Sequence, residues 1–314
     1  MRQSVLIVAL FCVGALSACD FLAPEEPDRE RYVVRMFLSA QEPLPPLILS
    51  TLSEFEDDIQ GESVPDANVW LEKLTEADDV EQRWVYERRN IFNDDSTQLL
   101  GTHGPVREIQ ELAPVKPLAR YRLVVELEED DHQITSTTTV PDTFSVAVAS
   151  HEALPYRDEE QLALELTESE YPNRDAFYII TNESTKEELS RDDFTPDAAR
   201  LYPNVDDPDE LERLRRGSSP VVNEAGYSLT ERGFRRISVP WISFRFFGPN
   251  LVKVHALDDN TYDFMRTQQV QQGGSTLAPG ETPNVIDQID GGTGIFGATA
   301  TASFSFTLLR NEGE

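Results

Sequence analysis

The chain has 314 residues, and its 27 Lys and Arg stand against 57 Asp and Glu, which gives a formal charge of −30. Hydrophobic residues make up 39 %, which is enough apolar material for a core and excludes wholesale disorder. The acidity excludes a nucleic-acid-binding protein that works by bulk electrostatics, because phosphates would be repelled.

The first 18 residues predict a lipoprotein signal peptide. Arg2 precedes an apolar stretch over residues 5–16. At about 1.5 Å per residue this stretch is too short for a permanent membrane-spanning helix, but it fits the apolar region of a secretory signal. It ends in Leu16-Ser17-Ala18-Cys19, which resembles a bacterial lipobox. Cys19 is therefore the predicted lipid attachment site, and the alternative is ordinary signal cleavage beside a chance cysteine.

The predicted anchor has consequences for the mature chain. The only other cysteine, Cys12, lies in the removed segment, so no intrachain disulfide is expected. Acylated Cys19 would bind membrane lipid stably, since three acyl chains exceed the one-chain threshold. Residues 19–30 are acidic and contain Pro24 and Pro27, which predicts a tether. The expected location is the cell envelope, most simply the outer membrane, with the periplasmic or surface side left open.

Residues 31–141 read mainly as strands. The segment 67–74 alternates with period two, which places Val69 and Leu71 on one face and Trp70 and Glu72 on the other. Segments 120–127 and 134–140 flank a short acidic turn and predict a hairpin that ends at Pro141. The further strands expected in this half are 32–38, 47–50 and 82–88.

Residues 142–314 mix strands with short helices. Asp207, Pro208 and Gly217 mark the start and end of a helix. A second helix is expected to follow Asp258 and run to residue 272, and a capping-box pattern predicts a third over 184–191. The expected strands are 144–149, 176–182, 242–247, 251–257 and 299–309, with a turn at Gly248-Pro249-Asn250 between the third and the fourth.

The spacing of these elements predicts a mainly β fold. Many short strands, few helices and no alternation of strand and helix favour two antiparallel β-sandwich-like domains, with a few short helices in the second. The predicted division is a signal peptide at 1–18, a tether at 19–30, an N-terminal β-sandwich domain at 31–141 and a C-terminal domain at 142–314.

No pattern predicts a catalytic residue, a cofactor or a metal. Residues 292–297 read G-x-G-x-x-G, but a strand pattern follows them where a dinucleotide site needs a helix, so they are expected to form a loop into the last strand. The four histidines lack metal-ligand spacing. Asn204, Asp206, Asp207 and Asp209 could offer oxygen ligands to Ca²⁺, but capping of a helix by Asp207 explains the run equally well.

A local cluster of arginines interrupts the acidic sequence. Six arginines fall within 24 residues, namely Arg213, Arg215, Arg216, Arg232, Arg235 and Arg236. One interpretation is a basic patch that binds an anionic partner such as a carboxylate-bearing glycan or an acidic protein surface. The other is internal pairing with Glu210, Glu212, Glu224 and Glu231.

The chain resembles the family known as domain of unknown function 4249, found in envelope lipoproteins of Bacteroidetes and their relatives. The resemblance rests on four features in order: Cys19 shortly before the strand at 32–38, the stretch at 64–71, the strand-into-helix segment at 252–264, and Asn284-Val285 followed by Gly294-Ile295-Phe296-Gly297. The resemblance implies an envelope lipoprotein of the outer membrane with no assigned reaction. Members often occur beside TonB-dependent receptors.

We therefore expect a non-enzymatic, lipid-anchored protein that binds a ligand or partner at the envelope and assists an outer-membrane receptor. A structural or adhesive surface lipoprotein is the alternative, and a hydrolase of surface polymers is a third. The oligomeric state is not indicated.

Overall fold

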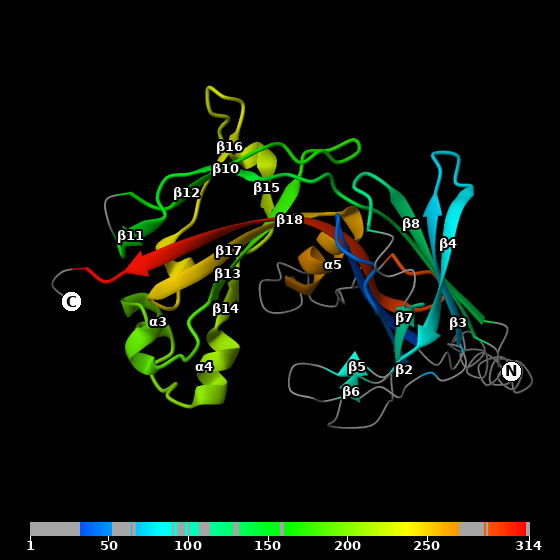
Figure 1. Cartoon of the computed structure of the whole chain (residues 1–314), viewed down its shortest axis with the longest axis horizontal. Coiled ribbons are helices and arrows are strands. Elements are labelled where there is room, and N and C mark those ends of the chain that lie inside the picture. Colours follow the sequence, from blue (N-terminus) through cyan, green and yellow to red (C-terminus); the bar gives the residue numbers. More distant parts are fainter. Residues whose placement is uncertain are drawn as a thin grey trace, which may run out of the picture. The chain divides into compact units, whose positions relative to one another are not determined.

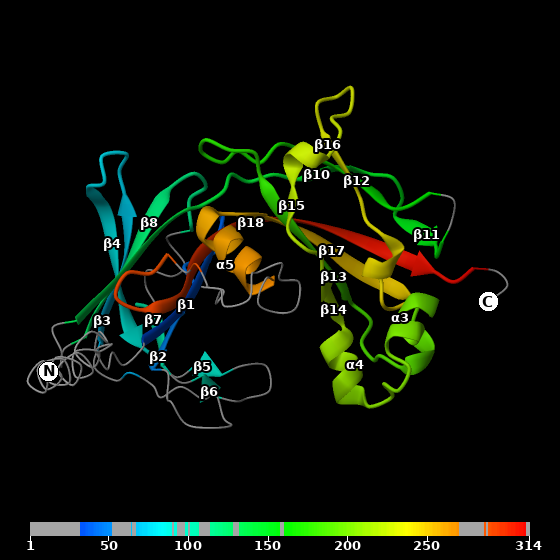
Figure 2. The same ribbon diagram turned by 180° about the vertical axis from the view of Figure 1, so that it is seen from behind.

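A computed structural model gives the fold of the chain (Figure 1) and shows it from the opposite side (Figure 2). It describes residues 32–51, 64, 67–89, 91–92, 98–99, 101–106, 114–127, 132–157, 160–269, 286 and 288–311. The predicted signal peptide, the tether and Cys19 lie outside the described residues.

Most described residues of the first half lie in strands. The strands are β1 (Tyr32–Ser39), β2 (Leu47–Thr51), β3 (Ala67–Leu74), β4 (Val80–Arg88), β5 (Ile91–Phe92), β6 (Gln98–Leu99), β7 (Thr102–Pro105), β8 (Arg120–Leu127) and β9 (His132–Thr139).

The second half adds further strands, among them the long β17 and β18, and all the described α-helices. Its strands are β10 (Val146–Ala149), β11 (Ala153–Pro155), β12 (Ala163–Leu166), β13 (Phe177–Ser184), β14 (Arg216–Ser218), β15 (Val222–Asn223), β16 (Arg235–Ser238), β17 (Gly248–Leu257) and β18 (Thr293–Leu309). Its helices are α3 (Pro196–Leu201), α4 (Pro208–Leu214), α5 (Asp259–Gln269) and the 3₁₀ turns η1 (Arg191–Asp193), η2 (Glu224–Gly226) and η3 (Trp241–Ser243).

One large sheet runs through both halves in the order β14-β13-β17-β18-β1-β2-β7-β4-β3-β8-β9. Its pairings are antiparallel except that β1 and β11 run parallel to β18. A second sheet, β10-β12-β16, packs against the inner face of β13, β17 and β18 through buried residues such as Leu164, Tyr178, Ile237 and Val254. The prediction of a mainly β, sandwich-like fold with short helices in the second half is confirmed.

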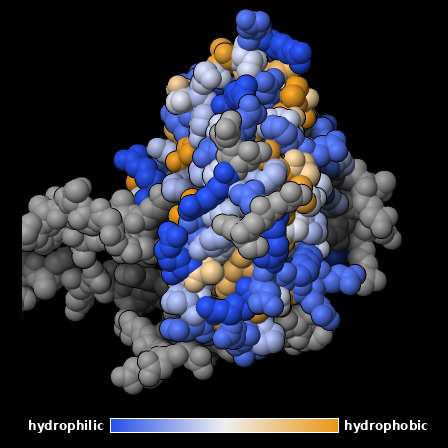
Figure 3. Space-filling view, turned by 90° about the vertical axis from the view of Figure 1, so that its left-hand side faces the viewer, coloured by the Kyte–Doolittle hydropathy of each residue, from blue (hydrophilic) through white to orange (hydrophobic). Residues whose placement is uncertain are grey.

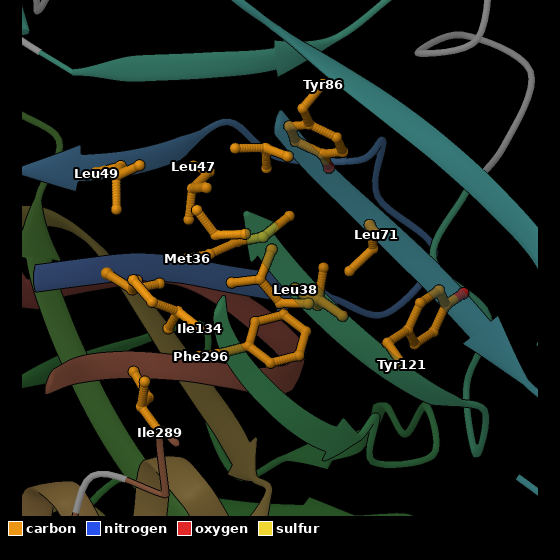
Figure 4. Packing of buried hydrophobic residues seen from close by; sticks show 14 of the residues in the cluster. Met36, Leu38, Leu47, Leu49, Leu71, Tyr86, Tyr121, Ile134, Ile289 and Phe296 are labelled. Carbon is orange, nitrogen blue, oxygen red and sulfur yellow. The ribbon is translucent and has the colours of Figure 1, made fainter. Parts of the chain in front are cut away.

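Two main hydrophobic cores follow from this arrangement. Alternate residues of β1, β3 and β8 point inward and pack around Met36, Leu71 and Phe296 in the first core (Figure 4). The second core contains Tyr178, Phe306 and the inner residues of the second sheet. Residues 32–314 form one compact unit, in which β18 supplies side chains to both cores. The division at 141/142 stays a prediction.

The junction between the halves is held by the start of α5. The buried Asp258 carboxylate accepts a hydrogen bond from the hydroxyl of Thr138 on β9 and, at 2.9 Å, from the backbone N–H of Thr261. The Asn260 amide donates to the carbonyls of Thr137 and Phe296 at 2.9 and 2.8 Å. These bonds tie α5 to β9 and β18, which lie in different parts of the large sheet.

Three local predictions were wrong. Residues 242–247 are not a strand, because η3 follows Pro240 and the backbone carbonyl of Phe246 accepts a hydrogen bond from the side-chain amide of Asn250. The turn expected at Gly248-Pro249-Asn250 is the start of β17. Ser184 does not begin a helix, because it is the last residue of β13 and pairs with Asn250.

The surface reflects the composition. In the face drawn in Figure 3, hydrophilic residues predominate and the hydrophobic ones form small separate groups. Such a surface is expected for a chain with a formal charge of −30.

Candidate functional site

The outer face of β13, β17 and β18 carries a band of polar side chains. Successive residues of a strand alternate between faces, and the inner residues of these strands are in the second core. The register places Lys253 beside Thr181 and Ser303, and His255 beside Thr301. We call this band the hydroxyl face, and it consists of Thr181, Glu183, Arg216, Lys253, His255, Thr301, Ser303 and Ser305.

His255 is at the centre of the hydroxyl face and is held by two hydroxyls. Its Nε2 lies 3.0 Å from Thr181 Oγ1, and its Nδ1 lies 2.9 Å from Thr301 Oγ1. Burial, followed by the nearby charges of Lys253 and Arg216, lowers the pKa of His255 to about 4. The imidazole is therefore neutral at pH 7, with one nitrogen as donor and the other as acceptor.

The hydroxyl face also contains charged side chains. Glu183 is 2.9 Å from Arg216 and 3.7 Å from Lys253, measured between the carboxylate oxygen and the nearest basic nitrogen. One carboxylate between two cations leaves this spot with one net positive charge in a strongly acidic chain. The hydroxyls of Thr301, Ser303 and Ser305 are on exposed residues and can donate to or accept from a ligand. The arrangement suits polar recognition.

The six predicted arginines are divided between elements. Arg213 lies in α4, Arg215 directly after it and Arg216 in β14, whereas Arg235 and Arg236 lie in β16 and Arg232 in the turn before it. Figures 1 and 2 draw α4 and β16 on opposite sides of β18. Only Arg216 belongs to the hydroxyl face.

Three of the six arginines are paired with internal carboxylates. Arg215 pairs with Glu212, and Arg216 pairs with Glu183. Arg235 lies 2.7 Å from the buried Glu224. Within the described residues, no ion pair involves Arg213, Arg232 or Arg236, so the interpretation as a partner-binding patch stays a prediction for these three.

The G-x-G-x-x-G stretch has a structural role in the described fold. It does not form the expected loop, because the last strand already begins at Thr293. A Cβ on Gly294 would lie 2.1 Å from the carbonyl oxygen of Val34, and one on Gly297 would lie 2.2 Å from Thr261 Oγ1. These glycines let β1 and α5 approach β18 closely.

Neither of the metal arrangements considered from the sequence is assembled. Asp207 caps α4 by accepting hydrogen bonds from Asp209 N and Glu210 N, and Asp206 pairs with Arg191. Across the described ranges, no three His, Cys, Asp or Glu side chains lie close enough together to hold a metal ion.

A second polar feature lies at the end of β3. A pocket of about 340 Å³ is lined in part by Lys73, Glu81, Lys116 and Arg120. Lys73 and Glu81 form an ion pair at 2.8 Å, and this contact together with its hydrogen bond raises the pKa of Lys73. The lining of the pocket thus contains an internally neutralised pair together with Lys116 and Arg120.

Sequence reasoning missed the hydroxyl face. The alternation of Thr301, Ser303 and Ser305 with apolar residues was a visible signal for a polar strand face. The partners Thr181 and His255 lie far away in the chain, and only the strand register brings them together.

Fold and site together define a mainly β protein with an open polar sheet face. No helix among the described residues is long and apolar enough to cross a membrane. The sequence matches the family described as a domain of unknown function, DUF4249, over residues 20–305, and the chain therefore belongs to this family. A comparison with curated proteins gives no match.

Proposed function

We propose that this protein is a non-enzymatic binding protein, anchored to the cell envelope by lipid on Cys19, that assists an outer-membrane receptor of the TonB-dependent class. The hydroxyl face is the observation that carries the binding role. It presents hydroxyls, a neutral imidazole and a paired Glu183 on the open side of a sheet whose other side is packed. Such groups recognise polar ligands by hydrogen bonds.

The anchoring part of the proposal is supported by Leu16-Ser17-Ala18-Cys19 after an apolar stretch. The receptor part is supported only by analogy with the genomic neighbours of the family. The chemistry of His255 favours binding over catalysis at this face, since both ring nitrogens are occupied and the pKa of about 4 makes the imidazole a weak base at pH 7.

The test compares complexes captured from native envelopes. The full-length protein is immunoprecipitated from detergent-solubilised envelopes, and its companions are identified by mass spectrometry. We expect a TonB-dependent barrel with the wild type, and its loss with Lys253→Glu, which makes the face acidic. Glu87→Lys on the exposed side of β4 is the control and should retain the barrel. An eluate without a barrel, or equal recovery with Lys253→Glu, would contradict the proposal.

The anchor has a separate readout. In Cys19→Ser the lipoprotein pathway should not cleave the signal peptide, and the protein should carry no acyl chains. Mass spectrometry of the N-terminal peptide of wild type and variant measures both. If the mature wild-type protein begins at a residue other than Cys19, or if its N-terminus carries no acyl chains, the lipid anchor is contradicted. The proposed binding role is tested separately by the immunoprecipitation.

A further inference from the structure

β18 has an unpaired stretch along one edge. On one side it pairs with β17 from Thr299 to Leu308. On the other side it pairs with β1 up to Thr299 and with β11 from Thr307 onward. Between these two partners, no described strand pairs with residues 300–306 on that side.

The orientation of the backbone groups follows from hydrogen bonds at both ends of this stretch. The carbonyl of Ala298 accepts from Asp258 N on the β17 side. The carbonyl of Thr299 accepts from Ala40 N, and Thr307 N donates to the carbonyl of Glu152, both on the other side. Successive residues of a strand direct their N–H and C=O groups to opposite edges, so Thr301, Ser303 and Ser305 direct theirs to the unpaired edge.

Among the described residues, the backbone groups of Thr301, Ser303 and Ser305 make no hydrogen bond on that side, although β10 of the second sheet comes near β18. All three residues are exposed. The N–H and C=O groups of these three alternate residues could form ladder hydrogen bonds with the backbone of another extended chain.

We propose that residues 300–306 of β18 bind a short extended segment of a partner protein, which adds a strand between β1 and β11. The stretch covers about 20 Å at roughly 3.3 Å per residue, which limits the added strand to five to seven residues. This proposal concerns the sheet edge and does not depend on lipid anchoring or on a receptor.

The flanking strands argue against a second copy as the occupant. A two-fold pair of β18 edges would run antiparallel and place Ser303 opposite Ser303 of the other copy. Thr299 of one copy would then lie opposite Thr307 of the other. Each of these residues already carries a strand on that edge, β1 at Thr299 and β11 at Thr307, so the two copies would collide.

The surroundings define the chemistry of the segment. Its outward side chains would lie beside the hydroxyls of Thr301, Ser303 and Ser305. Its inward ones would lie beside the half-buried Phe304, which packs against the second core. The formal charge of −30 on the whole chain favours basic flanks that lie away from the local positive charge of Lys253 and Arg216. The expected partner is therefore an unfolded segment with alternating polar and apolar residues, bordered by Lys or Arg.

The test uses seven-residue random peptides displayed on phage and selected on the immobilised full chain. The peptides recovered are synthesised, and their Kd is measured for the wild type, Ser303→Pro and Ser303→Ala. Proline removes an N–H that points to the free edge and leaves the ladder to β17 intact, whereas alanine keeps that N–H. We expect at least a tenfold weaker Kd for Ser303→Pro and less than a threefold change for Ser303→Ala.

A second measurement covers the case in which Ser303→Pro fails to fold. Each peptide is N-methylated at alternate positions and tested on the wild type. Methylation in one register should abolish binding and methylation in the other should preserve it, because only alternate N–H groups face β18. Recovery of no peptide, equal binding to Ser303→Pro, or indifference to the methylation register would overturn the proposal.

Discussion

Glu72 shows how this acidic chain stabilises a buried carboxylate. Its side chain lies on β3 and is only 1 % exposed. Arg83 Nε on β4 and Arg122 Nε on β8 each donate to one carboxylate oxygen at 2.8 Å. Burial alone would raise the pKa of Glu72, but hydrogen bonds and charges from Arg122 and Arg83 hold it below the ordinary value of 4.5. The carboxylate is thus ionised in the folded protein and links three strands.

Glu72→Gln is expected to lower the free energy of unfolding at pH 7 by about 2 kcal/mol, because it leaves two guanidinium groups facing an amide. A depressed pKa stabilises the fold above pH 4.5, and this contribution is lost as the pH falls through the pKa of the folded state. The difference between variant and wild type should therefore shrink towards pH 3. Urea unfolding at both pH values measures it.

The exposed Glu87 on β4 provides the matched control. Glu87→Gln should change the free energy of unfolding by less than about 0.5 kcal/mol at either pH. A Glu72→Gln variant as stable as Glu87→Gln at pH 7 would show that the two arginines are satisfied without the carboxylate.

At the scale of elements, the close pairing of β1 with β18 depends on Gly294. Its φ is +115°, a backbone conformation that side chains rarely adopt, and an added Cβ would lie 2.1 Å from the carbonyl oxygen of Val34. Gly294→Ala should lower the free energy of unfolding by roughly 2 kcal/mol or more. Thermal unfolding followed by circular dichroism measures the loss.

Gly226 is the control for this change, since an added Cβ there meets nothing within 4 Å. Gly226→Ala should leave the melting temperature nearly unchanged. Equal melting temperatures for the two variants would mean that the pairing of β1 and β18 adjusts without cost, and that the glycine is not required for it.

How far the sequence predicts these elements depends on whether their determinants are local. The strands at 67–74 and 120–127 were located to the residue, because strict alternation and flanking turns are local signals. The helix after Asp207 was also found from its cap. The prediction for the segment 242–247 failed because Phe244 packs in the second core, whereas Phe246 packs with Phe194 and Leu211 in a separate small cluster. Alternation alone does not reveal this difference.

The candidate site was less predictable than the fold for the same reason. The arginine cluster was chosen by proximity in sequence, whereas strand register decides proximity in space. His255 meets Thr181 and Thr301 across two strand pairs separated by 74 and 46 residues. A single sequence does not show which residues of two strands pair, so these contacts could not be derived from it.

At the scale of the molecule, β18 couples the two hydrophobic cores. Phe296 and Ala298 lie in the first core, while Ala300, Phe306 and Leu308 lie in the second. Because β18 is one continuous strand, unfolding of its first part would also disturb the part that packs in the second core. The fixed junction at Asp258 and Asn260 strengthens this coupling.

This coupling predicts one cooperative unfolding transition. Phe296→Ala removes a buried ring from the first core, and Phe306→Ala removes one from the second. Each substitution should lower the free energy of unfolding by about 3–5 kcal/mol. Both should move a single transition, which is followed by fluorescence of Trp84, in the first core, or of Trp241, which packs on the second. Each reporter variant retains one of these two tryptophans and lacks the other as well as Trp70, the third tryptophan of the chain. Two separate transitions, each sensitive to only one substitution, would instead show that the halves on either side of residue 141 unfold as independent domains and that β18 tolerates a break between them.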